Sequence, residues 1–164
     1  MDALEVLSKR HSVRKFADTP VARESVEKMV DCARFAATAM GIQPWEFVIV
    51  TDINLRKRLA DTLEFGKFVA QAPVAIVVLC KETKYYLEDG CNATENLLLA
   101  ATALGLGSCW VAGDKKPYVD YIRSLVGAPA GFRVIAVVAV GYAAEETGSP
   151  AKRPLEEVIH WEKF

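Results

Sequence analysis

The chain is short of the residues from which many active sites are built. It has only two histidines among 164 residues, and its four cysteines include no C-x-x-C pair. The cysteines do not cluster with the histidines, so no metal site is predicted. No Ser–His–Asp grouping is apparent, and Cys109 lies in an apolar run where a buried thiol is usually inert. We therefore name no catalytic side chain and expect any chemistry to belong to a bound cofactor.

The sequence also lacks a basic excess and long apolar runs. Lys plus Arg is 20 and Asp plus Glu is 21, a net charge of -1, which argues against a general nucleic-acid or membrane-surface binder. Apolar runs break before about 18 residues and no charged-then-apolar leader is seen, so we expect a cytoplasmic protein with reduced thiols. The length and 52% hydrophobic content favour one folded domain, residues 1–164.

Two common phosphate-binding loops are absent. The glycine-rich stretch "GLGSCWVAG" (105–113) lies between a predicted helix and a predicted strand, the reverse of the strand–loop–helix order of a Rossmann motif, and no Walker A pattern occurs. Its glycines would let backbone amides approach a ligand closely, although a simple turn explains them as well.

The apolar pattern predicts an α+β fold with a central mixed or antiparallel sheet sandwiched by helices. β-Branched and continuous apolar runs predict strands over 45–51, 72–80, 108–112 and 132–142. Other segments predict helices over 2–10, within 17–40, and over 54–65, 93–107 and 116–127. The 93–107 helix is apolar almost all round, so a partner subunit is a candidate for part of its cover.

What is present is a basic row near the N-terminus, "RHSVRKF" (10–16). In an extended chain Arg10, Ser12 and Arg14 fall on one side within about 14 Å, at roughly 3.3 Å per residue. Guanidinium groups and a hydroxyl suit phosphate oxygens. The alternative is a solvated basic turn after a helix, where cations favour the C-terminal dipole.

Two further stretches have the same double interpretation. Lys152 and Arg153 of "AKRP" either solubilise a polar tail or close on the phosphate from the other side. Gln43 and Trp45 of "GIQPWEF" either line a ligand or simply start a strand around a core indole. Four carboxylates are predicted to lie at the surface: Asp89, Glu95, Glu145 and Glu146.

Taken in order, six segments resemble the nitroreductase family of FMN-dependent oxidoreductases. They are "RHSVRKF", "QPWEFVIV", "APVAIVVL", "ENLLLAATALGLGSCWVAG", "VIAVVAVGYAAE" and "KRPLEEV", and they span residues 10–158. The resemblance implies an intertwined homodimer with FMN at the interface. It also implies ping-pong hydride transfer from NAD(P)H through flavin N5 to a nitroaromatic, a quinone or a similar small aromatic acceptor. Nucleic acid and membrane are not expected as partners.

The resemblance also implies which residues touch FMN. Arg10, Ser12, Lys152 and Arg153 match phosphate-binding positions, and Arg14 matches a position near the ribityl chain and the N1/O2 edge. Residues 38–41 match a segment that contacts the partner's cofactor, and 110–113 match a segment beside N5 and O4. The full expected set is Arg10, His11, Ser12, Arg14, Thr38, Met40, Gln43, Trp110, Val111, Ala112, Gly113, Lys152 and Arg153.

The sequence departs from the family pattern in three places. Gly41 stands where the family usually has Asn, "GYAAE" lacks a common proline, and residues 65–72 leave little room for the helical excursion that often covers the pocket. We therefore expect an open site. An open site also suits the alternative of an FMN-binding electron-transfer or storage protein without nicotinamide turnover. A flavin-free structural domain is a third interpretation, and it predicts a colourless protein.

Overall fold

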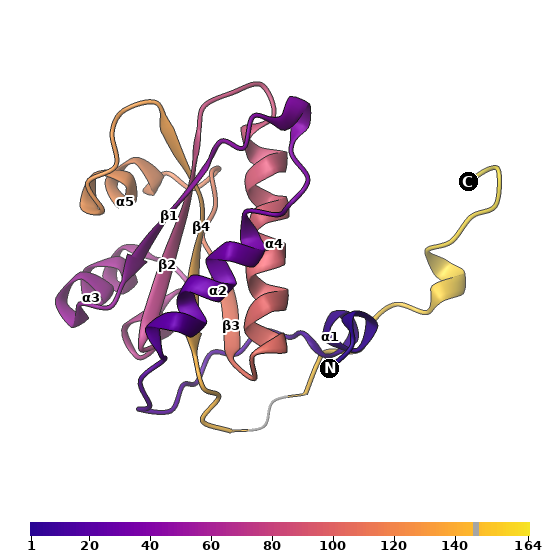
Figure 1. Cartoon of the computed structure of the whole chain (residues 1–164), viewed down its shortest axis with the longest axis horizontal. Coiled ribbons are helices and arrows are strands. Elements are labelled where there is room, and N and C mark those ends of the chain that lie inside the picture. The colour runs from indigo at the N-terminus through magenta and orange to yellow at the C-terminus, as the bar shows by residue number, and fades with distance from the viewer. Residues whose placement is uncertain (146–147) are drawn as a thin grey trace.

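A four-stranded antiparallel sheet forms the centre of the computed structural model, which describes residues 1–145 and 148–164 (Figure 1). The sheet order is β1-β2-β4-β3. Its strands are β1 (Trp45–Val50), β2 (Val74–Lys81), β3 (Gly107–Val111) and β4 (Phe132–Gly141). Each strand matches its predicted range within two residues at either end, and the predicted α+β class is confirmed. Every pair of neighbouring strands is antiparallel.

The described residues form five α-helices. They are α1 (Ala3–Lys9), α2 (Arg23–Ala33), α3 (Ile53–Thr62), α4 (Tyr86–Ala103) and α5 (Val119–Leu125). Short 3-10 helices are η1 (Ala39–Gly41), η2 (Lys67–Ala70) and η3 (Leu155–Glu157). Capping explains two of the helix starts, because the Asp2 carboxylate accepts from the Glu5 amide at 2.9 Å and the Asp52 carboxylate accepts from the Leu55 amide at 2.8 Å.

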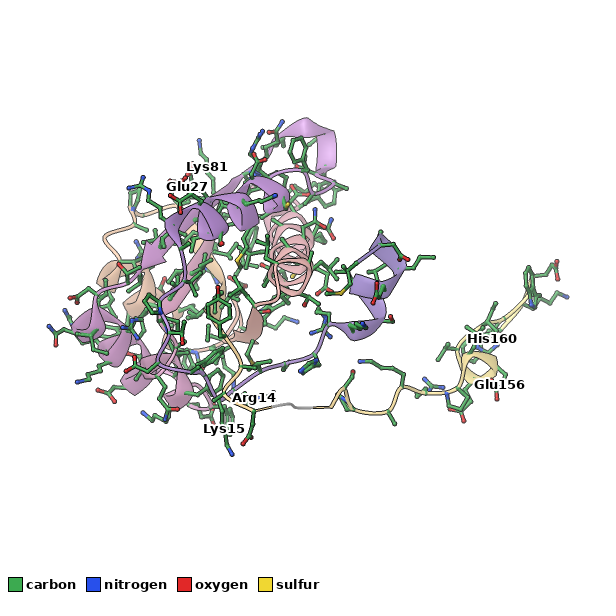
Figure 2. The ribbon with its side chains drawn as sticks, turned by 60° about the horizontal axis from the view of Figure 1, so that its bottom comes forward. Arg14, Lys15, Glu27, Lys81, Glu156 and His160 are labelled. Carbon is green, nitrogen blue, oxygen red and sulfur yellow. The ribbon has the colours of Figure 1, made fainter. Side chains whose placement is uncertain are left out.

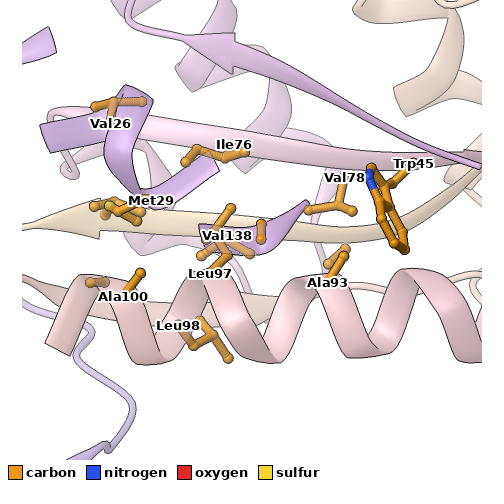
Figure 3. Packing of buried hydrophobic residues seen from close by; sticks show 14 of the residues in the cluster. Val26, Met29, Trp45, Ile76, Val78, Ala93, Leu97, Leu98, Ala100 and Val138 are labelled. Atoms are coloured by element: carbon orange, nitrogen blue, oxygen red, sulfur yellow. The ribbon is translucent and has the colours of Figure 1, made fainter. Parts of the chain in front are cut away.

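The two faces of the sheet are both buried, which is why β2 and β4 are apolar runs without alternation. Along β2, Ile76 and Val78 pack with α2 and α4, whereas Val77 and Leu79 pack in the cluster beneath α3 and α5. Figure 3 shows the first cluster. The register shifts between Val78 and Leu79, which pair with Ala136 and Val134, so Ile135 is the extra residue of a β-bulge in β4.

The long helix α4 differs from its prediction at the N-terminal end. It begins at Tyr86, seven positions before the expected start at 93. The predicted helix did not include residues 86–92, and the glycine within them has a packing reason. A Cβ on Gly90 would lie 2.6 Å from Ile135 Cγ1 and 2.8 Å from Cys80 Sγ, so the helix can approach the sheet closely only with glycine at this position.

Within one chain α4 is already well covered. Ala93, Leu97 and Ala101 are fully buried between α2, α4 and the sheet. The expectation that a partner covers this helix therefore applies only to its remaining exposed side. In the described residues, no helix is both long and apolar enough to cross a membrane.

The two ends of the chain behave differently (Figures 1 and 2). The segment after α1 runs back along the sheet, and Arg14 and Lys15 lie on the body. The last residues, which carry η3, extend away from the body, and every described residue from 148 to 164 is exposed.

Candidate functional site

The basic row is fixed along the outer edge of β3. The Val13 amide donates to the Ser108 carbonyl at 2.9 Å, and Ser12 pairs with Ser108 in a parallel bridge. Phe16, three residues after Val13, pairs with Ala143 just beyond β4. Because β3 is an edge strand, its free backbone groups hold the row by main-chain hydrogen bonds.

The alternation predicted from sequence places the two sets of side chains on opposite sides. Val13 is buried, and a Cβ on Gly107 would lie 2.8 Å from Val13 Cβ. Burial raises the pKa of the Cys109 thiol on β3, while the charge of Arg14, a hydrogen bond from Ser12 and the charge of Arg10 act to lower it. The charges of the row therefore act on a residue of the strand that the row follows.

The charge balance of the row leaves it suited to an anion. Arg10 Nε lies 3.5 Å from Glu95 Oε1, and the Arg10 side chain is 22% exposed. Arg14 is exposed and forms no ion pair with another described residue. Two guanidinium groups against one carboxylate, with a hydroxyl between them, form a donor set that fits a phosphate dianion. Glu95 is exposed, as predicted, but it also acts as the counter-ion of Arg10.

His11 alternates with Arg10, Ser12 and Arg14, so its side chain belongs with that of Val13. Its Nδ1 is 2.9 Å from the Lys9 carbonyl oxygen. Together with Val13 and Gly107 it lines a hollow of about 620 Å³. Neither Arg10 nor Arg14 lines this hollow, and among the described residues of its wall only Lys9 is a lysine or arginine. The role of His11 at a cofactor stays a prediction.

The turn after β3 borders a second hollow of about 500 Å³, together with residues of α4 and β4. Trp110, Ala112 and Gly113 line it. The Val111 side chain is buried in the core beneath α3 and α5, so this residue can offer a ligand only its backbone. Ala112 has a φ of 63°, a left-handed conformation that is costly for alanine.

A buried carboxylate holds the loop that contains Thr38, Met40 and Gln43. The Asp89 carboxylate accepts from the Thr38 hydroxyl at 3.0 Å and from the Ala39 amide at 2.8 Å. The same hydroxyl accepts from the Gln43 amide at 3.1 Å. Asp89 is 2% exposed, so its predicted place at the surface is wrong.

The loop that Asp89 holds has unusual backbone angles. Met40, Gly41 and Gln43 have φ values of 54°, 66° and 52°. Glycine at 41 therefore suits a left-handed turn, which a side-chain amide at this position would make costlier. Met40 is 77% exposed, so its own chain leaves most of this side chain uncovered. Within the described residues no hydrogen bond or ion pair joins this loop to the basic row.

The two basic residues of the tail stand apart from the row in a single chain. Lys152 and Arg153 are exposed, and Arg153 pairs instead with Glu157, at 3.3 Å between Nε and Oε2. Their place at the phosphate remains a prediction that requires a second subunit. Of the predicted surface carboxylates, Glu145 is exposed and pairs with Lys15 at 3.0 Å, and Glu146 lies outside the described residues.

Sequence reasoning missed two anchoring carboxylates. Asp89 lies four residues before Ala93 and eight before Leu97, both buried, so it continues the buried stripe of α4 and could have been found. Asp114 accepts from the Arg133 Nε at 2.7 Å and from the Tyr86 hydroxyl at 3.0 Å. No local signal indicates this second cluster, because its members come from three different elements.

Comparison with known proteins agrees with this fold. The model of the nitroreductase family matches residues 7–64 and 61–142, most of the chain. A protein of Methanothermobacter thermautotrophicus with the provisional name NADH dehydrogenase/NAD(P)H nitroreductase is 34% identical, over all of this chain and 88% of its own length. The chain therefore belongs to the nitroreductase family, as the ordered motifs predicted.

Solved structures agree with this assignment over almost the whole chain. A crystal structure from Parabacteroides distasonis, with the same provisional name, has a TM-score of 0.94 and 31% identity, and the match covers 99% of this chain and 98% of that one. An FMN-dependent nitroreductase from Clostridium difficile has a TM-score of 0.92 and 29% identity, with coverage of 98% and 99%.

Proposed function

We propose that the chain works as a homodimer that transfers hydride from NAD(P)H, by a ping-pong mechanism, to a small aromatic acceptor such as a nitroaromatic or a quinone. Its place in the nitroreductase family makes it an oxidoreductase with FMN as cofactor, in keeping with the structural neighbour named FMN-dependent. FMN, when bound, supplies the redox chemistry. The protein's own residues bind and orient it.

The observation that carries the proposal is the juxtaposition of the basic row with the turn after β3. Ser12 and Val13 are held against Ser108 on β3, the strand that ends in the turn at Ala112 and Gly113. A phosphate held by the row would leave the rest of a flavin nucleotide free to lie toward this turn. A cation beside the isoalloxazine also favours its negatively charged reduced form.

The second subunit would complete the site. The loop at 38–43 and the tail at 148–164 each have exposed apolar side chains without cover in their own chain, among them Met40, Trp161 and Phe164. Exposed apolar surface of this kind is typical of an interaction site. In a homodimer these segments would reach the partner's row, and Arg153 would then meet the phosphate.

The first experiment tests cofactor and turnover. The purified protein is expected to be yellow and dimeric, and to lose its visible flavin absorbance on anaerobic mixing with NADH or NADPH. Flavin that stays oxidised with both nucleotides would favour the electron-transfer or storage alternative instead. The connection between α3 and β2 keeps that alternative open, because it holds only the short helix η2, and Phe65 is 74% exposed there.

The second experiment tests the phosphate site. The double substitution Arg10→Ala with Arg153→Ala is expected to strip FMN while the far-ultraviolet circular dichroism stays unchanged. Each charge-assisted contact contributes about 1.5–3 kcal/mol. The matched control is Lys15→Ala with Lys163→Ala, which removes the same charge from the same two segments. Full flavin occupancy in the first double variant would contradict the placement of the phosphate.

A further inference from the structure

We propose that Asp114 is a positioning residue that holds the turn from Ala112 to Lys116 in the shape in which it presents backbone amides to the cofactor. The inference rests on the proposed function, because it takes FMN to lie against this turn. Asp114 itself would act through the turn and would touch no reacting atom.

The carboxylate of Asp114 ties the turn to two other elements. Arg133 on β4 donates to Oδ1 at 2.7 Å, and Tyr86 at the start of α4 donates to Oδ2 at 3.0 Å. The Asp114 side chain is only 11% exposed. Both oxygens are therefore used, one by a cation and one by a phenol. Charge-assisted hydrogen bonds that are partly buried are stronger than neutral ones.

The backbone of the turn needs such support. Ala112, with its left-handed φ, is in a conformation that persists only when its surroundings hold it. On one side the Trp110 indole donates to the Ala112 carbonyl at 3.0 Å. On the other side the Lys116 amide donates to the Gly113 carbonyl at 3.1 Å. Asp114 follows Gly113 in this turn, and its carboxylate joins the turn to β4 and to the start of α4.

The amides of the turn are available to a ligand. Within the described residues, the N–H groups of Ala112 and Gly113 donate to no protein acceptor. Successive N–H groups around a left-handed residue form a concavity that favours negative charge. The turn also lines the 500 Å³ hollow together with Leu87 and Cys91. Free donors at the wall of a hollow suit the electron-rich edge of a flavin.

The two groups that donate hydrogen bonds to Asp114 stay protonated near neutral pH. Burial and the hydrogen bond to Asp114 raise the pKa of Tyr86, so the phenol remains a donor at neutral pH. The same carboxylate raises the pKa of Arg133, which remains a cation. Neither donor is therefore lost near neutral pH.

Two substitutions test the proposal, one at the acceptor Asp114 and one at its donor Tyr86. Asp114→Asn keeps the size of the side chain but removes its charge, and Tyr86→Phe removes one hydrogen bond. The matched controls are Asp120→Asn, an exposed carboxylate on α5, and Tyr85→Phe, the neighbouring phenol. We expect FMN affinity to fall about tenfold in Asp114→Asn and about threefold in Tyr86→Phe, with the controls unchanged.

Two readouts separate positioning from general stability. The reduction potential of bound FMN is expected to shift in both variants, because the donors beside the cofactor move. Hydrogen exchange at the amides of 112 and 113 is expected to become faster in the flavin-free variants, while exchange in β2 stays slow. Tyr86→Phe preserves the test if Asp114→Asn fails to fold.

Each outcome decides one of the two claims. Unchanged FMN affinity, potential and exchange in a folded Tyr86→Phe or Asp114→Asn variant would overturn the positioning role. A wild-type protein that binds no FMN would overturn the proposed function and, with it, the part of this inference that concerns the cofactor. Exchange in the flavin-free chain would still show whether Asp114 holds the turn.

Discussion

The N-terminal segment 10–17 and the C-terminal tail 148–164 both contain basic residues, yet only the first is held by its own chain. The segment is tied in its middle, by the Val13 amide to the Ser108 carbonyl, and at its end, by the Ala17 amide to the Tyr142 carbonyl, each at 2.9 Å. Its cations are therefore in place before any ligand arrives. Preorganised groups of this kind lose less freedom on binding.

Among the described residues, the hydrogen bonds, the ion pair and the ring contact of the tail all lie within the tail itself. Arg153 pairs with Glu157, and the rings of His160 and Phe164 lie 4.4 Å apart. Its apolar side chains are exposed, with Trp161 at 78% and Leu155 at 69%. From this difference we propose that the chain builds one half of an anion site alone, and that a second copy of the chain supplies the other half.

The largest effect is expected from deleting the tail, residues 149–164. The truncated chain should be monomeric and almost free of flavin, because both the apolar contacts and Arg153 are removed. Its far-ultraviolet circular dichroism should match that of the full chain. Light scattering and flavin absorbance measure both effects, with Lys163→Ala in the full chain as the control. A yellow, dimeric truncated protein would show that the tail has no part in the site.

The next largest effect comes from displacing the anchored segment. Gly107→Val introduces side-chain atoms where a Cβ alone would lie 2.8 Å from Val13 Cβ. Overpacking of this kind costs about 1–3 kcal/mol, and the row should leave β3 and lose FMN affinity. Urea unfolding and FMN titration measure these changes.

The matched control for this substitution is in the tail. Gly148→Val adds the same atoms at a position with no heavy atom within 4 Å of the added Cβ. Its free energy of unfolding should stay within error of wild type. Equal effects from the two substitutions would remove the distinction between an anchored segment and an unanchored tail.

A third test uses alkaline pH, because all four cysteines lie in the body and none in the tail. Burial, with smaller contributions from the charges of Asp89 and Cys91, raises the pKa of Cys80 to about 12. The folded chain keeps this thiol protonated above the pH at which the unfolded chain ionises it. Its contribution to stability is therefore complete below about pH 9 and is lost as the pH rises from about 9 toward 12.

The measurement is urea unfolding at several alkaline pH values. The free energy of unfolding should fall by up to about 1.4 kcal/mol per pH unit for this one proton. Cys80→Ala should flatten the slope, whereas Cys32→Ala, at an exposed position, should leave it unchanged. Parallel curves for wild type and Cys80→Ala would contradict the shifted thiol.

The smallest expected effect concerns the two carboxylates that face the basic residues. Glu95→Gln should release Arg10 and strengthen FMN binding by about 1.4- to fivefold, which is the range of a weak ion pair of about 0.2–1 kcal/mol. Glu157→Gln should change affinity less, because the Arg153 pair is more exposed. Glu24→Gln is the neutral control. A larger effect at Glu157 would show that the tail, and not the row, dominates phosphate binding.

Local patterns in the sequence were sufficient for much of the fold. The strands were found because β-branched residues run through them without interruption, and the side of the row that carries Arg10 and Arg14 followed from simple alternation. The start of α4 was missed because its helical glycine, Gly90, is explained only by the sheet beneath it. Asp89 was misplaced because its donors, Thr38 and Ala39, lie about fifty positions away.

By itself, the sequence determined the family, the positions of the strands, and a row of cations and a hydroxyl on one side of an extended segment. Only the tertiary structure decided that β3 is an edge strand next to this row, and that Asp89 and Asp114 hold loops. The physical reason is range. Periodicity and β-branching act between neighbours in the chain, whereas the fate of a carboxylate depends on donors that folding brings from distant elements.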